Sequence, residues 1–482
     1  MPKSGKRLKK VRSHPYDKDS EETAPPRFNG AFDFSADAPY NNFLLRTEAA
    51  IPKPIAPIPD HGRALDKRSE RARKRFGPIL DALQHELLQF YTDKTFEEHQ
   101  NVRKSYLRAR TLGQTEEYLA DVRRRSRLVF GRKSPNPFST RILSSDGQTL
   151  LVYLAFRAPP EILQVNKQQN KSQALRKKAK ASDQPVMKDL DSSNKSTRVY
   201  FHGMPEDVRS RYHQATQMLL AFVPPEKPKE SSRRHGGLDP TKQASYYTTH
   251  RGWDGKQELR PERVGTLHIV SCWTQRGHPT EVTCYILLCS PLVFNYPQNM
   301  THSSSIKSNA QAPHAHEKWF DITYEAHLYL SMLFEREFPE QFRQYQRAHS
   351  AAKWYRTDPG PYIGRVIVWK LHSTDHIDNE DGCPTATWTV GGSYTGGFLD
   401  FVDAETRFLY QPGHIVLGWT GFLFHKVTDW VCKPTATLDS QRVGVTPGRV
   451  AAVNYFPIAS FNILKDKQGG WGRKTLYGAM VE

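Results

Sequence analysis

The sequence is short of cysteine and of apolar residues, and both shortages narrow what the chain can be. It has five cysteines in 482 residues, none of them spaced as CxxC. That count is too small for a disulfide framework, and the spacing does not suit a structural zinc site. Scarce cysteine favours a reducing compartment. Apolar residues make up only 37% of the chain, so we expect part of its length to be unfolded.

Long apolar runs are also missing. No stretch of about 20 apolar residues occurs, so we expect no transmembrane helix and no membrane partner. The opening MPKSGKRLKKVR has no apolar segment and predicts no secretory signal. It is a basic cluster, typical of nuclear localisation or nucleic-acid binding, with a solvated tail as the plain alternative. We therefore expect a nuclear protein.

Acidic residues are outnumbered. The chain carries 69 Lys and Arg against 50 Asp and Glu, a formal net charge of +19. This favours a polyanionic partner, although charge alone does not choose among DNA, RNA and an acidic membrane surface. The segment EEYLADVRRRSRLVF predicts a helix whose arginines are candidate phosphate contacts, or equally a solvated face. These are Arg123, Arg124, Arg125 and Arg127.

Shifts in composition indicate how the chain is organised. Residues 1–77 hold a proline-spaced stretch, AIPKPIAPIP, and a charged one, DKRSERARKRF; neither can bury much surface, so we predict a disordered basic tail. One domain is expected over residues 78–482, with helices and strands over 78–350 and a β-rich core over 360–465. Flexible polar insertions are predicted near 164–198, 225–255 and 299–318.

Apolar spacing predicts individual elements of the first part. Leu80 and Leu83 fall at helical spacing after Pro78, and residues 322–350 predict a helix with a kink at Pro339. TLLVYLAFRAP predicts a strand. VGTLHIVSCW and EVTCYILLC predict paired strands joined by a hairpin turn.

The last third of the chain has a different character. It contains seven short segments rich in β-branched and aromatic residues: GRVIVWKL, TATWTV, GGFLDFV, TRFLYQ, HIVLGWT, FLFHKV and RVAAVNYF. Their density predicts a β-sandwich or jelly-roll barrel. With the helices before it, the expected fold class is α+β.

One segment, LHSTDHIDNEDG, concentrates acidic residues and histidines in this basic chain. His376 and Asp378 form an HxD pair, and residues i and i+2 of a strand point to the same side. Two histidines and one carboxylate on one face make the facial triad of non-haem iron(II) oxygenases, which leaves further coordination positions open. His372 and Asp375 compete as ligands, but their HxxD spacing puts them on opposite faces. A polar loop after a strand is the plain alternative.

The order of the motifs adds weight to the pair. After HxD come GGSYTGGFLDFV, then PGHIVLGWTGFLFHKVT with His425, then a strand that opens with an arginine. Residues 360–465 resemble the double-stranded β-helix core of Fe(II)/2-oxoglutarate dioxygenases, and most of all the compact fungal members of the TET/JBP branch. The resemblance implies that His376, Asp378 and His425 hold Fe(II), with 2-oxoglutarate and O2 as cosubstrates.

The resemblance also implies an arginine for the distal carboxylate of 2-oxoglutarate. Arg449 and Arg442 are the candidates. Arg449 follows Pro447-Gly448 and opens an apolar strand, whereas Arg442 lies in the loop-like DSQRVG, and an arginine fork suits a carboxylate. We favour Arg449. The family's arginine lies closer to the distal histidine, so an insertion is implied.

The base-binding residues are less well defined. Tyr455 stands six residues past Arg449, where the TET-like pattern has an aromatic residue that stacks on the extruded base; an ordinary core tyrosine is the alternative. The family's histidine two residues further on is Pro457 here, and its Asn three residues after HxD is Asp381, which puts the base identity in doubt. Asp381, Asp403 and Gly397 are the remaining candidates.

The resemblance implies an activity. A monomeric dioxygenase of this kind oxidises 5-methylcytosine in double-stranded DNA to hydroxymethyl-, formyl- and carboxylcytosine, or hydroxylates N6-methyladenine so that formaldehyde leaves and adenine remains. The methylated nucleotide must be flipped out of the duplex to react. The alternatives are a catalytically inactive or transposon-associated DNA-binding protein, and an oxygenase that acts on protein.

Overall fold

The computed structural model describes residues 61–175, 201–226, 247–251, 257–261, 264–274, 300–301, 303, 305–306, 312–378, 384–432 and 448–472. The chain divides into two units, Pro59–His250 with Glu258–Glu482 and Met1–Ile58 with Arg251–Gln257. The two sheets, the helices and the candidate site described below all belong to the first unit.

A nine-stranded sheet forms the centre of this unit. Its order is β1-β2-β3-β14-β11-β17-β9-β6, and β16 pairs with β11 off this path. All pairs are antiparallel except β1 with β2. The strands are β1 (Leu88–Tyr91), β2 (Thr140–Leu143), β3 (Thr149–Leu154), β6 (Gly265–Val270), β9 (Gly364–Trp369), β11 (Thr385–Gly396), β14 (Ile415–Gly418), β16 (Trp430–Cys432) and β17 (Gly448–Tyr455).

A four-stranded antiparallel sheet accompanies the large one, in the order β10-β15-β12-β13. Its strands are short: β10 (Ser373–His376), β15 (His425–Val427), β12 (Leu399–Phe401) and β13 (Thr406–Phe408). A hydrophobic core lies between the two sheets, where Tyr153 of the large sheet stacks on Phe408 of the small one with ring centroids 4.2 Å apart. Two ladders complete the β structure, β4 (Tyr247–Arg251) with β5 (Gln257–Pro261) and β7 (Trp273–Thr274) with β8 (Met300–Thr301).

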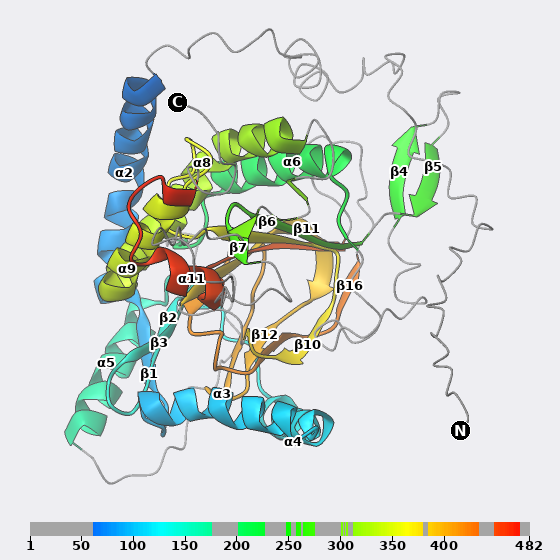
Figure 1. The fold of residues 1–482 in the computed structure, drawn as a ribbon. Helices are drawn as coiled ribbons and strands as arrows, with labels where there is room; N and C mark the ends of the chain where they lie inside the picture. Colours follow the sequence, from blue (N-terminus) through cyan, green and yellow to red (C-terminus); the bar gives the residue numbers. More distant parts are fainter. Residues whose placement is uncertain are drawn as a thin grey trace, which may run out of the picture. The chain divides into compact units, whose positions relative to one another are not determined.

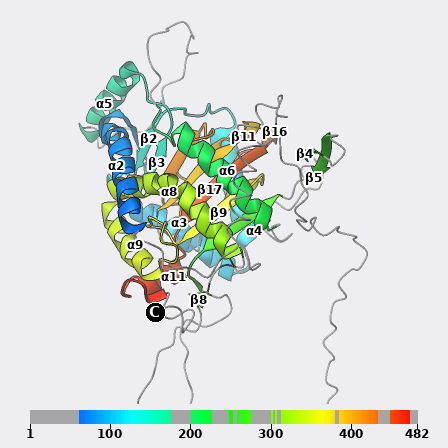
Figure 2. The same ribbon diagram turned by 90° about the horizontal axis from the view of Figure 1, so that it is seen from above.

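Helices cover the outer faces of both sheets. They are α2 (His61–Glu86), α3 (Phe96–Thr111), α4 (Thr115–Phe130), α5 (Pro160–Leu175), α6 (Glu206–Phe222), α8 (Ala312–Glu337), α9 (Pro339–Ala352) and α11 (Ile458–Leu464). Figures 1 and 2 show α6 and α8 lying across one face of the large sheet, where Tyr212 packs edge-on against Trp388 of β11 at 4.7 Å. On the other side α3 and α4 lie against the small sheet (Figure 1), with Tyr106 packing on Phe424 at 5.7 Å.

The β-rich character of the last third is as predicted: each of the seven segments contains a strand, namely β9, β11, β12, β13, β14, β15 and β17. TLLVYLAFRAP contains β3 and VGTLHIVSCW contains β6. The second strand of the predicted pair, EVTCYILLC, lies outside the described residues, and β6 pairs with β9. The mixture of helices and sheets is therefore confirmed. Among the described residues, no helix combines the length and the apolar character needed to cross a membrane.

The predicted boundary of the tail at residue 77 is wrong. Residues 61–77 belong to α2, which continues through Pro78 to Glu86. The charged segment is helical because its few apolar residues share one face: Ala72 and Phe76 are buried, and the Phe76 ring packs edge-on against Tyr329 of α8 at 5.0 Å. Residues 1–60 lie outside the described part of the chain.

Two of the predicted insertions are shorter than expected, and Pro339 begins a new helix instead of kinking one. Helix α5 runs to Leu175 inside the segment 164–198, and α8 begins at Ala312 inside 299–318. Part of the segment 225–255 forms β4, and its middle lies outside the described residues. Near Pro339 there are two helices, with Phe338 as the N-cap of α9 and Pro339 as its first residue, where the missing N–H of proline costs no helical hydrogen bond.

Candidate metal centre

Three predicted ligands come together where β10 ends and β15 begins. His376 is the last residue of β10 and lies directly opposite His425, the first of β15. Asp378 follows two residues later, and its backbone N–H donates to the Thr420 carbonyl at 3.0 Å, which fixes the chain after the strand. One ligand atom from each of the three side chains lies within 4.8 Å of the other two.

The two imidazoles are held in the tautomer that a metal requires. Nδ1 of His376 donates to the Thr374 carbonyl at 2.6 Å, and Nδ1 of His425 donates to the Leu423 carbonyl at 2.9 Å. A histidine that donates from Nδ1 presents the Nε2 lone pair to a metal. These Nε2 atoms lie 3.7 Å and 3.6 Å from the two Asp378 carboxylate oxygens. Atoms so spaced can both lie about 2.1 Å from one point, the usual bond length to a small divalent ion.

Asp403 fixes the backbone next to His425. Its carboxylate accepts the Phe424 backbone N–H at 2.9 Å and lies 3.4 Å from the Arg125 guanidinium of α4. The side chain is 0% exposed. Asp403 was a candidate base contact; the structure buries its side chain, and its carboxylate fixes the backbone of the residue that precedes His425.

Arg449 lies at the start of β17, opposite Gly392 of β11. Its side chain is buried, its Nη2 donates to the Thr389 hydroxyl at 3.2 Å, and the guanidinium lies over the Tyr410 ring at 4.8 Å. Among the residues that the structure describes, none accepts a hydrogen bond from its Nε atom. Gly397, predicted as a base contact, lies instead beside the stem of this arginine, where a Cβ would be 3.4 Å from Arg449 Cδ.

Three other buried or half-buried arginines show what Arg449 lacks. Arg365 pairs with Asp358 at 2.6 Å, Arg407 grips both oxygens of Asp400 at 2.7 and 2.8 Å, and Arg141 pairs with Glu337 at 2.6 Å. Within the described part of the chain, no carboxylate lies within 4.0 Å of the Arg449 guanidinium. A buried charge without a counter-charge is costly, so its surroundings fit an incoming carboxylate.

Sequence reasoning missed the hydroxyl groups around this arginine. Tyr394 and Tyr410 are buried close to it, and the Tyr394 hydroxyl donates to the Tyr410 carbonyl at 3.3 Å. Burial raises the pKa of Tyr394 to about 12, and it raises the pKa of Tyr410 as well, partly offset by Arg449. Both therefore stay protonated and can donate. The motifs GGSYTGG and LYQPG hold these residues, but no spacing rule connects them with Arg449.

Tyr455 lies at the other end of β17. It is six residues from Arg449, a distance of about 20 Å along a strand. Its hydroxyl lies 3.4 Å from His268 Nδ1 and its ring packs against Gly364. β17 pairs with β9 without a bulge, so alternation puts Arg449 and Tyr455 on one face. Whether Tyr455 touches a base stays a prediction, and Asp381 and Arg442 lie outside the described residues.

The competing ligand pair is separated. The His372 ring stacks on Trp430 with centroids 4.6 Å apart, while the Asp375 carboxylate faces Lys426 at 3.7 Å. Burial raises the pKa of Asp375, partly offset by Lys426. Neither residue belongs to the cluster around Asp378.

The arginines of α4 are mostly engaged on the protein. Arg123 faces Glu116 at 3.9 Å, Arg124 pairs with Asp121 at 2.6 Å, and Arg125 bridges Asp121 and Asp403. Arg127 is exposed and forms no ion pair with the residues that the structure describes. Helix α4 packs beside the metal ligands, because its apolar face meets Ile377 and Phe424. Exposed ion pairs are weak and exchange readily for phosphate, so phosphate contacts by these arginines stay a prediction.

Comparisons with known proteins give matches among solved structures, but none among family models or curated proteins. No protein-family model matches the sequence, and no curated protein matches it. Among solved structures, NgTET1 in complex with 5mC DNA is similar over 72% of this chain and 91% of that chain, with 10% identity and a TM-score of 0.35. OsALKBH1 is similar over 26% of this chain and 63% of that chain, with 14% identity and a TM-score of 0.18. Similarity this low carries no argument about function, which must come from the side chains themselves.

Proposed function

We propose that this protein is an iron(II)- and 2-oxoglutarate-dependent dioxygenase of TET/JBP type, with a double-stranded β-helix core, that oxidises methyl groups on bases of double-stranded DNA. One observation carries the proposal: two Nε2 atoms and a carboxylate converge within 4.8 Å on neighbouring strands, each imidazole oriented by a backbone carbonyl. Two histidines and one carboxylate are the donor set of the non-haem iron(II) facial triad.

The residues fit the metal and its cosubstrate. His376, Asp378 and His425 would hold one face of the ion, which leaves positions for the 2-oxoacid group and O2. When bound, iron, 2-oxoglutarate and O2 together supply the oxidising equivalent, and 2-oxoglutarate leaves as succinate and CO2. The protein supplies the geometry and a dry site, since the side chains of Asp378 and His425 are only 10% and 9% exposed.

The anchor for the cosubstrate is built from this chain's own donors. Arg449 would pair with the distal carboxylate, and Thr389, Tyr394 and Tyr410 surround its guanidinium with hydroxyl groups. The clearest sign that an anion is still to be bound there is that no carboxylate of the described residues pairs with this buried guanidinium.

DNA is the proposed substrate because the motifs resemble the TET/JBP branch and the charge of the chain suits a phosphate polymer. A formal charge of +19 favours a phosphate polymer, and the arginine-bearing helix α4 packs beside the metal ligands. A methyl group inside a duplex cannot reach a half-buried iron site, so the nucleotide must be flipped out. The proposed products are hydroxymethyl-, formyl- and carboxylcytosine from 5-methylcytosine, and adenine with formaldehyde from N6-methyladenine. Because of the basic cluster MPKSGKRLKKVR we also propose a nuclear location. We further propose that the enzyme is a monomer.

Mass spectrometry of nucleosides tests the proposal. Full-length protein with Fe(II) and 2-oxoglutarate is incubated with duplexes that carry 5-methylcytosine or N6-methyladenine. The Asp378→Ala protein removes the central ligand, and His372→Asn is the matched control, because it alters a histidine of the same segment that lies outside the cluster. Oxidised cytosines, or lost N6-methyl groups, should appear with wild type and His372→Asn and be absent with Asp378→Ala.

Succinate release separates the alternatives. Iron-dependent succinate formation that methylated DNA does not stimulate would favour an oxygenase acting on protein. Tight DNA binding without iron binding, measured by metal analysis of the purified chain, would favour an inactive DNA-binding protein. Either result would refute the proposed reaction on DNA.

A further inference from the structure

Two surface hollows lie away from the candidate metal centre, and their charges differ. The smaller, of about 390 Å³, is lined by both signs of charge, and its ions pair with one another: Arg336 with Asp81 at 2.7 Å and Arg73 with Glu335 at 3.8 Å. The larger, of about 510 Å³, is lined by three cations and no carboxylate. Its lining residues are Phe342, Arg343, Gln346, Arg347, Ser350, Lys467 and Gly469.

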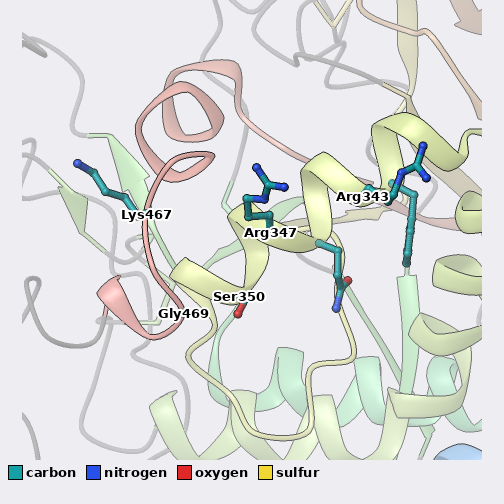
Figure 3. Close-up of a pocket in the computed structure, with 7 residues that line it drawn as sticks. Arg343, Arg347, Ser350, Lys467 and Gly469 are labelled. Atoms are coloured by element: carbon teal, nitrogen blue, oxygen red, sulfur yellow. The ribbon is translucent and has the colours of Figure 1, made fainter.

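The backbone segments that carry the three cations are fixed to each other by packing and a hydrogen bond. Arg343 and Arg347 are one helical turn apart on α9, about 6 Å along the axis, and Figure 3 shows them projecting to the same side. Lys467 belongs to the segment after α11, which is tied to α9 by the hydrogen bond from Gly470 N to the Ser350 carbonyl at 2.9 Å. Packing of Tyr345 on Phe461, with centroids 5.3 Å apart, holds α11 against α9.

These cations are not neutralised by the protein. In the part of the chain that the structure describes, none of the three lies within 4.0 Å of a carboxylate, although Glu340 and Asp466 are near in sequence. Three like charges around one hollow repel each other, and the smaller hollow shows that this surface elsewhere pairs its arginines. The hollow therefore has the charge of an anion site.

The shape and the donors select the kind of anion. The lining residues Arg343, Gln346, Arg347, Ser350, Lys467 and Gly469 are all exposed, so the hollow suits a polymer that passes over it better than an enclosed metabolite. Arginine forks pair with two phosphate oxygens, lysine adds a point charge, and the Ser350 hydroxyl and Gln346 amide can donate as well.

We propose that this hollow binds the phosphodiester backbone of a nucleic acid and is a second DNA contact, separate from the metal centre. The proposal rests on the proposed function for the identity of the partner. It assigns to α9 and the segment after α11 a role in holding the duplex, while the residues near Asp378 act on the base.

The test is the salt dependence of DNA binding by the full-length protein. Fluorescence anisotropy with an unmethylated duplex at several salt concentrations gives the slope of log K against log salt. Each phosphate neutralised contributes about 0.9 to that slope. The variant Arg343→Gln/Arg347→Gln/Lys467→Gln should lower its magnitude by about one to three and weaken binding at every salt concentration. These residues are exposed, and an unchanged melting temperature will confirm that the fold is intact.

A matched variant separates a local contact from a general loss of charge. Arg71→Gln/Arg73→Gln/Lys74→Gln removes three exposed cations from α2, so the net charge falls by the same amount. It should keep the wild-type slope. An unchanged slope in the first variant, or an equal fall in both, would overturn the proposal. So would binding of inorganic phosphate that the first variant abolishes while its DNA slope stays at the wild-type value.

Failure of the proposed second DNA contact can be distinguished from failure of the proposed function. The Asp378→Ala protein should keep the wild-type slope while losing turnover. Absence of turnover on every duplex, with the slope reduced only in the α9 variant, would refute the proposed reaction and leave this contact standing. Turnover on methylated DNA, with an unchanged slope in the α9 variant, would support the proposed reaction and refute this contact.

Discussion

Arg449 gives the sharpest test of the site, because a buried arginine without a carboxylate should affect binding more than folding. In the described part of the chain its polar partners are hydroxyl groups, and Nε has none. If 2-oxoglutarate supplies the missing carboxylate, Arg449→Met removes one partner of a buried charged pair, which costs about 3 to 5 kcal/mol. At about 1.4 kcal/mol per factor of ten, affinity for 2-oxoglutarate should fall by about two to four orders of magnitude.

The same substitution should leave the ligand-free protein nearly as stable as wild type. Arg449→Met removes a desolvated charge that has no counter-charge among the described residues, so we expect the free energy of unfolding to change by no more than about 1 kcal/mol. Arg407→Met is the contrast, since it strands the Asp400 carboxylate, which is 0% exposed. Losing that pair should cost about 3 to 5 kcal/mol.

Two measurements check these expectations. Anaerobic titration calorimetry of 2-oxoglutarate into the Fe(II)-loaded protein gives the affinity, and urea unfolding without ligands gives the stability. Arg449→Lys keeps the charge but loses the fork, so its affinity should lie between those of wild type and Arg449→Met. The reasoning fails if Arg449→Met binds 2-oxoglutarate as wild type does, or if it destabilises the ligand-free protein as much as Arg407→Met.

Three further predictions follow from other parts of the site and core. Asp403→Ala leaves the buried Phe424 N–H without its acceptor, so iron affinity should fall about 10- to 100-fold, and Asp403→Asn should restore most of it in a metal-binding titration. Gly392 has φ of +114°, and a Cβ there would overlap the Gly448 carbonyl oxygen, so Gly392→Ala should lower the melting temperature and weaken 2-oxoglutarate binding. Gly147 is also at positive φ but in open space, so Gly147→Ala should leave 2-oxoglutarate binding intact. Burial lowers the pKa of four histidines from 6.5 to about 3 or 4, so the unfolded chain takes up protons that the folded chain does not, and stability should fall as the pH drops from 6.5 towards 4. The loss should reach about 1.4 kcal/mol per pH unit for each histidine, measured by urea unfolding at pH 7.5 and 5.5; a flat profile would contradict it. These residues are His213, His316, His327 and His414.

The candidate site could be predicted from the sequence only where local rules apply. Strand alternation brings His376 and Asp378 to one side, and a turn before an apolar strand singles out Arg449. The register that sets His376 opposite His425 is a long-range pairing with no local signal. Asp403 was misplaced for the same reason, since its acceptor role depends on how β12 and β15 lie against α4.

Helical segments with few apolar residues were the hardest to predict. DKRSERARKRF is mostly charged, and it folds because Phe76 has a partner on a helix distant in sequence. Helix α5 is another example. Its Asn166 amide accepts from Gln89 N–H at 2.9 Å and donates to Gln89 O at 3.0 Å, so the side chain caps the edge strand β1. Such contacts stabilise a polar segment through its neighbours, and composition cannot reveal them.

The charges of the site explain why an acidic segment and an unpaired arginine occur in one basic chain. With its histidines neutral, the site holds one negative charge on Asp378 and one positive charge on Arg449. A divalent cation alone would leave the Asp378 side with an excess positive charge, and a dianion alone would leave the Arg449 side with an excess negative one. Bound together, a dication and a dicarboxylate cancel both excesses. Each ligand should therefore tighten the binding of the other by the same factor, a coupling that neither a polar loop nor a solvated arginine would produce.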